Sequence, residues 1–284
     1  MRIGQIWPSI DSKSRLDKAL LRLGLIPGRC NICGSFTVFL IRNDMFREGV
    51  SCAACASVNR QRQMAAVLLS QVLGTRNRVP WLASINNIPE STVVWNAETT
   101  RALHKKLQLH LGANYISSEY LSPDLQSGDI IDNTLHVDIQ ATHFKDNSID
   151  YILTSDVLEH VPFPLQAMKE TYRILKPGGC HIFTVPFYKH RFSNETRAIV
   201  NAQGEVEHLH RPWYHEDPMS DDGVLVYTVF APELLCQLEA CGFDATLQIL
   251  RSPVHGMLGE NGLVIVAKKS HEPVFALDWI FGND

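Results

Sequence analysis

The segment from Asn147 to Phe187 places the strongest constraint on what this chain can fold into. It reads NSIDYILTSDVLEHVPFPLQAMKETYRILKPGGCHIFTVPF, with a short apolar run just before Ser155 and Asp156. That run predicts a buried strand, and a second buried strand follows the Lys-Pro-Gly-Gly turn. The helix expected between them carries apolar residues at three- and four-residue steps: Leu165, Met168, Tyr172 and Leu175. This order predicts a right-handed βαβ crossover, the repeating unit of an open parallel sheet.

The pattern continues on both sides of this segment. Before it, strands are expected at 92–96, 115–119 and 135–138, and a helix after the first strand has Leu103, Leu107 and Leu111 on one face. After it, a helix at 232–241 ends at Gly242, and an antiparallel strand pair is expected at 246–250 and 263–268. The chain therefore reads as an α/β protein.

The phrases SIDYILTSDVLEHV and ETYRILKPGG, in this order and spacing, resemble the class I S-adenosylmethionine-dependent methyltransferases of type 11. The resemblance implies a Rossmann-like fold with a seven-stranded sheet and helices on both faces. It also implies that S-adenosylmethionine lies at the carboxyl ends of the strands, next to Ser155 and Asp156. A generic α/β crossover that binds another ligand is the alternative.

The loop after the first strand departs from most of that family. Where relatives carry a G-x-G-x-G turn, this chain has Ala97, Thr99 and Arg101, so backbone angles open only to glycine become costly. The chain is similar to a subgroup in which the strand runs into a Pro/Ala-Glu loop. That likeness implies cofactor contacts from Asn96, Ala97 and Glu98, with Glu98 near the ammonium group or the substrate. A dipole-favoured acid in the first helical turn is the alternative for Glu98.

Two further positions are assigned to the adenosine part of the cofactor. An acid at the end of the second strand accepts hydrogen bonds from ribose hydroxyls in dinucleotide folds, and Glu119 stands there. The resemblance places Asp138 against the adenine amino group and Ile139 against the ring face.

Four cysteines near the amino end form two C-x2-C pairs separated by 18 residues: Cys30, Cys33, Cys52 and Cys55. Two such knuckles close a tetrahedral thiolate shell with no open position, which predicts a structural zinc ribbon. Two disulfides are the alternative, which a reducing compartment disfavours. The role of the ribbon beyond structure stays open. Its arginines (Arg42, Arg47, Arg60, Arg62) supply positive charge for contacts with nucleic acid. Its phenylalanines (Phe36, Phe39, Phe46) either stack on nucleic-acid bases or fill the ribbon core.

The segment 188–230 reads as an insertion on the substrate side, rich in His, Tyr, Trp and acids. By likeness to the subgroup, its candidate residues are Glu207, His208, Tyr214, His215 and Asp217. A base is needed when the acceptor is a hydroxyl, a carbon acid or a protonated amine. The candidates for that base are His208, His210, His215, Tyr214 and His160. A second metal site from His208, His210, His215 and Asp217 is an alternative, as is a structural His160.

These patterns divide the chain into a docking helix within 1–28, the zinc ribbon at 29–62, the methyltransferase-like domain at 63–270 and a tail at 271–284. The net charge of −4 argues against a protein wrapped around nucleic-acid phosphates. No apolar run approaches the roughly 20 residues of a membrane span, and the start MRIGQIWPSI lacks a signal-peptide core. We therefore expect a cytoplasmic protein.

Three functions are consistent with the sequence. The first is methyl transfer to a small molecule, such as a sugar or another biosynthetic intermediate, which the acidic charge and the His/Tyr insertion favour. The second is methyl transfer to RNA or protein, with the zinc ribbon as the substrate reader. The third is a catalytically silent fold that serves as a binding or scaffold subunit, which the lost glycines support.

Overall fold

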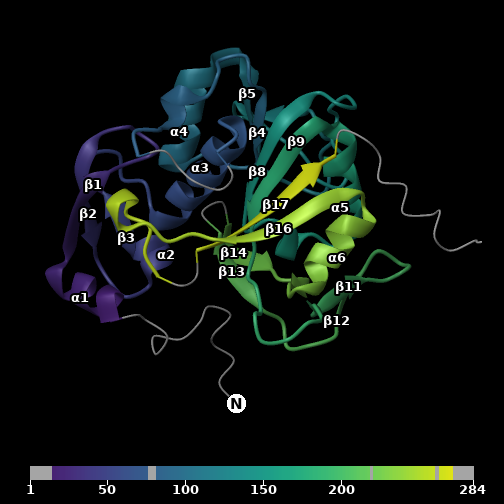
Figure 1. The fold of residues 1–284 in the computed structure, drawn as a ribbon. Helices are drawn as coiled ribbons and strands as arrows, with labels where there is room; N and C mark the ends of the chain where they lie inside the picture. Colours follow the sequence, from purple (N-terminus) through teal and green to yellow (C-terminus); the bar gives the residue numbers. More distant parts are fainter. Residues whose placement is uncertain (1–14, 76–80, 218–219, 260–261, 271–284) are drawn as a thin grey trace, which may run out of the picture.

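A six-stranded, mostly parallel sheet forms the centre of the computed structural model, which describes residues 15–75, 81–217, 220–259 and 262–270 (Figure 1). The strand order is β16-β17-β9-β8-β4-β5. The strands are β4 (Val94–Asn96), β5 (Tyr115–Ser117), β8 (Ile149–Ser155), β9 (Leu175–Thr184), β16 (Phe243–Ile249) and β17 (Leu263–Lys269). The first four run parallel, whereas β17 is antiparallel to both β9 and β16. The predicted α/β class is confirmed.

The expected count of seven strands differs from the described sheet. Of the segment 135–138 predicted as the third strand, only Leu135 belongs to a strand, β7 (Thr134–Leu135), which pairs with β6 (Ile130–Ile131) in a small ribbon. It joins the main sheet only through one parallel bridge between Glu119 and His136. The described sheet therefore has six strands, with a single bridge at its edge in place of the seventh.

Helices cover both faces of the sheet (Figure 1). On one face lie α3 (Asn59–Val72) and α4 (Arg101–Leu111), and on the other lie α5 (Pro164–Ile174) and α6 (Glu233–Ala240). Strand side chains alternate between the two layers, since Ile182 packs in the core with α3 and Phe183 in the core with α5. Burial on both faces explains why these strands are continuous apolar runs.

The apolar spacing predicted for α5 is correct only in part. Met168 is fully buried, but Leu165 is 47% exposed. The helix ends at Ile174, and Leu175 already belongs to β9. Leu165 in the first turn of α5 therefore does not pack against the sheet. Strand β9 begins before Gly178 and Gly179.

The cysteine-rich module is continuous with the sheet core. It comprises α1 (Arg15–Leu23), β1 (Leu25–Arg29), β2 (Phe36–Ile41), α2 (Phe46–Gly49) and β3 (Val50–Cys52). Phe39 and Phe46 are buried in the same apolar cluster as α3, whereas Phe36 is 72% exposed. Two of the three phenylalanines thus fill the core. One continuous apolar cluster extends from the module to the sheet.

Arg62 of α3 ties this module to the loop around η5 (Pro253–His255). Its guanidinium is fully buried and donates to the carbonyls of Val50 and Ser57 in the module, and to those of His255 and Gly256 in the loop. It also stacks on the Phe39 ring, 4.7 Å from the centroid. Burial lowers the pKa of Arg62 to about 10, and the four nearby cysteine thiolates oppose that shift. The guanidinium is therefore a buried cation shared by both parts.

The insertion consists of short hairpins below the sheet in Figure 1. Its strands are β10 (Glu195–Thr196), β11 (Ala198–Val200), β12 (Val206–His208), β13 (Tyr214–Asp217), β14 (Ser220–Leu225) and β15 (Thr228–Val229). Short 3-10 turns also occur at Ile85–Asn87, Gly112–Asn114 and Leu158–His160. In the described part of the chain, no helix is long and apolar enough to cross a membrane. The predicted tail at 271–284 lies outside the described residues.

Replacing Arg62 by methionine should destabilise the protein strongly. The change removes the Arg62 donor from four buried carbonyls, of which Ser57 keeps the Cys52 N–H, so we expect a loss of about 3–5 kcal/mol in the free energy of unfolding. Urea denaturation of the zinc-loaded protein measures it. The matched control is Arg42→Met, an exposed arginine of the same module, which should change stability by less than about 0.5 kcal/mol. Equal effects of the two substitutions would contradict the role of Arg62.

Candidate functional site

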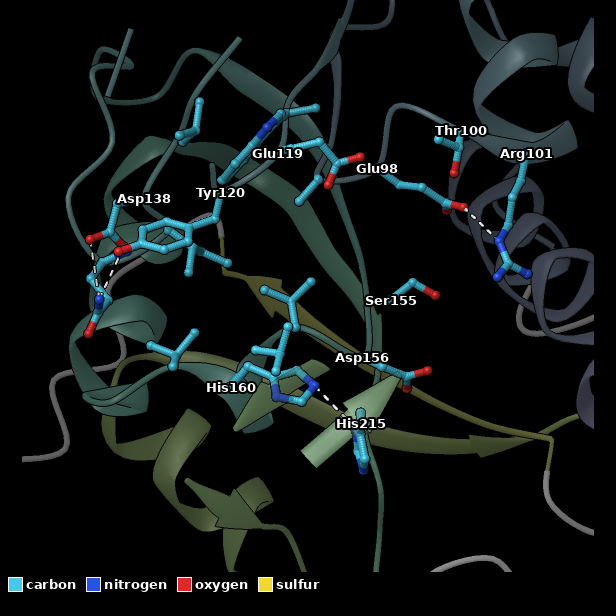
Figure 2. Close-up of a pocket in the computed structure, with 18 of the residues that line it drawn as sticks. Glu98, Thr100, Arg101, Glu119, Tyr120, Asp138, Ser155, Asp156, His160 and His215 are labelled. Atoms are coloured by element: carbon cyan, nitrogen blue, oxygen red, sulfur yellow. Dashed lines mark hydrogen bonds and ion pairs between the residues drawn. The ribbon is translucent and has the colours of Figure 1, made fainter. Parts of the chain in front are cut away.

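A pocket of about 320 Å³ lies at the carboxyl ends of β4, β5 and β8. Figure 2 shows its side chains arriving from the loops that follow these strands. Four carboxylates and two guanidinium groups line it: Glu98, Glu119, Asp138, Asp156, Arg60 and Arg101. The lining therefore carries an excess of negative charge, which suits a ligand with a cationic centre.

The loop after β4 forms almost without glycine-like backbone angles. Ala97, Thr99 and Arg101 occupy the positions of the glycines in a G-x-G-x-G turn. Of these three residues only Arg101 has a positive φ, at 67°. Asn96 is buried and turned away from the pocket, because its amide donates to the Tyr115 hydroxyl and to the Glu98 carbonyl. The backbone strain expected from the lost glycines is thus confined to Arg101.

Glu119 lies at the end of β5 and is held by this same loop. The backbone N–H and the hydroxyl of Thr99 both donate to its Oε1, each at 2.7 Å. These bonds fix the carboxylate at the pocket wall, across from Ser155 in Figure 2. A fixed, partly exposed carboxylate is a strong acceptor for ligand hydroxyls.

Asp138 and Ile139 form the far end of the pocket. The Asp138 Oδ1 accepts from the backbone N–H of Gln140 at 2.8 Å and from its side-chain amide at 3.1 Å. Ile139 and Val137 are buried apolar residues whose side chains border the same space. Tyr120 stands beside Asp138 at the rim (Figure 2). This end combines an apolar surface with one oriented acid.

Asp156, directly after β8, is bound by an arginine from the cysteine-rich module. Nη2 of Arg47, on α2, donates to both carboxylate oxygens at 2.6 Å, and the Thr184 hydroxyl donates to Oδ1 at 3.0 Å. Asp156 has a positive φ of 56°, so its backbone is strained in the geometry that this contact requires. Burial alone would raise the pKa of Asp156, but Arg47 and Arg60 outweigh it and lower the pKa to about 2.

Further ion pairs continue this network along the pocket wall. Arg60 Nε donates to Glu48 at 2.7 Å and lies 3.9 Å from Asp156, and Arg101 reaches the other Glu48 oxygen at 3.1 Å. Arg101 also lies 3.8 Å from Glu98. Burial raises the pKa of Glu98, while Arg60 and Arg101 oppose that shift. The module's Arg47 and Glu48 thus hold three charged side chains that line the pocket: Asp156, Arg60 and Arg101.

At the opposite side, Glu159, His160 and His215 converge. The two imidazoles approach at 3.2 Å between His215 Nδ1 and His160 Nε2, and Glu159 Oε1 lies 3.7 Å from each of these nitrogens. Burial raises the pKa of Glu159 well above its usual value, with Asp156 adding to the shift. Burial, and then His160, lower the pKa of His215 to about 4. His215 is therefore neutral at physiological pH.

The structure separates the candidate residues from the sequence into two groups. Those that line the pocket are Ala97, Glu98, Glu119, Asp138, Ile139, Ser155, Asp156, His160 and His215. Asn96, His208 and Tyr214 are not among the lining residues; His208 and Tyr214 are exposed on the hairpins. The side chain of Asp217 lies outside the described residues.

Sequence reasoning missed Arg47, Arg60 and Glu159. The arginines were assigned only to the ribbon surface, because no local pattern shows that α2 reaches the end of β8, 109 residues away in sequence. Glu159 stands beside His160 in a turn and gave no signal before its burial was known.

The four cysteines form a separate cluster away from the pocket lining. The sulfur atoms of Cys30, Cys33, Cys52 and Cys55 all lie within 4.8 Å of one another. Four sulfurs at this separation fit the donor set of a structural zinc ion. None of these four cysteines lines the pocket.

Comparison with known proteins found similarity to methyltransferases. Residues 100–183 match the family model described as Methyltransferase domain. The match covers this segment of the chain. Two curated relatives are similar to it over 78 residues: the demethylmenaquinone methyltransferases of Staphylococcus epidermidis (33% identity) and Staphylococcus aureus (37% identity). Each match covers 25% of this chain and 32% of the relative, so the chain spans about a third of their length.

Solved structures of methyltransferases are also similar to the chain. One is the 1,6-didemethyltoxoflavin-N1-methyltransferase of Burkholderia thailandensis, with 16% identity, a TM-score of 0.42 and coverage of 74% of this chain and 78% of that one. Another is DesVI of Streptomyces venezuelae, with 14% identity, a TM-score of 0.42 and coverage of 75% and 92%.

A double-mutant cycle on Arg47 and Asp156 tests the ion pair at the end of β8. The lowered pKa means that the stabilisation is present above the unfolded-state value of about 3.9 and is lost as the pH falls toward 2. At pH 7 it is present in full, so Arg47→Met and Asp156→Asn should show a coupling energy of about 2–3 kcal/mol in urea denaturation.

The matched control is the partly exposed pair Arg191–Glu195, four residues apart, in which Glu195 also pairs with Arg197; it should couple by about 0.5 kcal/mol or less. A coupling energy this small for Arg47 and Asp156 would mean that the contact is as weak as a surface pair.

Proposed function

We propose that this protein is an S-adenosylmethionine-dependent methyltransferase that acts on a small molecule. The observation that carries the proposal is the pocket at the carboxyl ends of β4, β5 and β8. A carboxylate that lines the pocket follows each of these strands. In open α/β sheets this edge is where nucleotide-type ligands bind. The matched methyltransferase-domain segment contains three of the lining carboxylates, Glu119, Asp138 and Asp156.

The adenosine part of the cofactor fits the left half of Figure 2. Glu119 is held by Thr99 in a position to accept hydrogen bonds from ribose hydroxyls. Val137 and Ile139 offer an apolar surface for the adenine ring, and Asp138 offers an acceptor for its amino group. Each contact pairs a ligand group with a side chain that is already fixed, which reduces the entropy cost of binding.

The amino-acid part fits the charged wall near the module. Arg60 and Arg101 are the cations that line this part of the pocket, and they suit a carboxylate. Glu98 lies beside them and suits an ammonium group. These side chains supply the contacts that backbone N–H groups of a glycine-rich turn provide elsewhere, so Ala97 and Thr99 are compatible with cofactor binding.

The acceptor lies on the side of His160 and His215. Bound S-adenosylmethionine supplies an activated methyl group on a cationic sulfur, and the excess of carboxylates in the lining favours that charge. The protein has to hold the acceptor atom in line with the methyl group, which is a proximity effect. Of the histidines and tyrosine proposed as bases, only His160 and His215 border the pocket.

A small acceptor is favoured over RNA by the position of the arginines. Arg47, Arg60 and Arg62 are engaged inside the protein, and of the four arginines that the sequence suggested for nucleic-acid contacts only Arg42 is exposed. The four cysteines hold a structural zinc ion in this proposal. Its role is to fix α2, and therefore Arg47, against the end of β8.

Calorimetric titration with S-adenosylhomocysteine tests the proposal on the zinc-loaded protein. Wild-type protein should bind one equivalent, and Glu119→Gln should weaken binding at least tenfold, because a charged acceptor of two hydrogen bonds is lost. The matched control is Glu205→Gln, an exposed position on the insertion, which should leave the affinity unchanged.

The two substitutions separate the claims. A folded wild-type protein that gives no binding heat contradicts the proposed function. Normal binding by Glu119→Gln contradicts only the assignment of the ribose contact.

A further inference from the structure

We propose that Glu159, His160 and His215 bind a divalent transition-metal ion at the acceptor side of the pocket. The three residues come from two separate parts of the chain, the turn after β8 and strand β13 of the insertion. The site is distinct from the four-cysteine cluster and differs from it in donor chemistry, with two nitrogens and one oxygen. Figure 2 shows the two imidazoles pointing toward each other near Asp156.

The spacing of the donor atoms fits a metal ion. His160 Nε2, His215 Nδ1 and Glu159 Oε1 form a triangle with edges of 3.2, 3.7 and 3.7 Å. A point at the centre of this triangle is about 2.1 Å from each atom, which is the usual length of zinc–nitrogen and zinc–oxygen bonds. Little movement is therefore needed for all three atoms to bind one ion.

The orientation of His160 also matches that of a metal ligand. Its Nδ1 lies 2.8 Å from the carbonyl oxygen of Leu225, and because a carbonyl only accepts, Nδ1 carries the proton. In the neutral ring, Nε2 then directs its lone pair at the cluster. A backbone carbonyl that holds the second nitrogen is the usual support of a metal-bound histidine. The Tyr227 N–H donates to the Glu159 carbonyl at 2.8 Å and fixes the turn to the insertion.

Glu159 provides the independent observation. Its side chain is fully buried, and both carboxylate oxygens lie without a hydrogen-bond partner among the described residues. Among the described residues, the cationic or potentially cationic side chains paired with it at 4.0 Å or less are the two imidazoles. A buried acid without partners is costly, and a cation at the centre of the triangle would satisfy it.

The ion's remaining positions would face the pocket, which His160 and His215 line and which Glu159 supports from behind. Two histidines and one carboxylate leave open positions in a divalent ion. This role rests on the proposed function: an acceptor hydroxyl on the ion becomes more acidic and releases its proton to water. The acceptor's oxygen then bonds to the methyl carbon of S-adenosylmethionine. The bond from that carbon to sulfur breaks at the same time, and the sulfur retains the electron pair. The acceptor class is therefore a hydroxyl compound.

Manganese binding tests the site in the zinc-loaded, full-length protein. Mn²⁺ binds a given set of ligands more weakly than zinc does and is poorly suited to thiolates, so it does not displace zinc from the four cysteines. Titration followed by the electron paramagnetic resonance of free Mn²⁺ should show one ion bound per chain. His215→Ala should weaken binding at least tenfold, whereas the exposed pair His208→Ala/His210→Ala, from the alternative set in the sequence, should not change it.

A second variant, Glu159→Gln, distinguishes loss of the metal site from loss of folding. The amide keeps the shape and removes a buried charge, so without added Mn²⁺ the zinc-loaded variant should unfold at the wild-type temperature or above it. Mn²⁺ should raise the unfolding temperature of the wild type and not that of Glu159→Gln.

Two results would overturn the site. One is wild-type protein that binds no Mn²⁺, and the other is an equal loss of Mn²⁺ affinity in His215→Ala and in the control His208→Ala/His210→Ala. Because Mn²⁺ binding is measured without cofactor, its failure is distinguishable from failure of S-adenosylhomocysteine binding.

Discussion

The contact between Arg47 and Asp156 connects the two halves of this molecule. It joins α2, a four-residue helix of the cysteine-rich module, to the carboxyl end of β8, where the pocket begins. Both side chains are largely buried, so neither charge is well solvated without the other. The position of α2 therefore fixes the electrostatics of the pocket, and Arg60 and Arg101 extend the same network along its wall.

The module is consequently packed against the site and holds charged side chains that line it. Arg62 binds carbonyls on both sides of the junction, and the apolar cluster around Phe39 continues into the sheet. Close packing at Gly28, where an added Cβ would lie 2.2 Å from the Val254 carbonyl oxygen, leaves little freedom between the parts. In the proposed function, Arg60 of α3 and Arg101 of α4 take the place of the backbone contacts of a glycine-rich loop.

Local sequence patterns predicted the α/β class, the order of the main strands and the helices between them, because buried strands and amphipathic helices have distinct periods. They also identified Glu119 and Asp156, which follow directly after strands. They could not place Arg47 or Glu159, since the first depends on a contact across 109 residues and the second on burial by the insertion. The third strand was overestimated, because Thr134–Leu135 pairs locally with β6.

Hydrogen exchange measured by mass spectrometry, with and without S-adenosylhomocysteine, tests most directly whether the module belongs to the cofactor site. Ligand binding stabilises the surroundings of the bound molecule against local opening. If the account is correct, amides of residues 46–62 in the zinc-loaded protein become protected together with those of 97–101 and 156–160. Protection confined to the strand-end loops, with no change in residues 46–62, would contradict it.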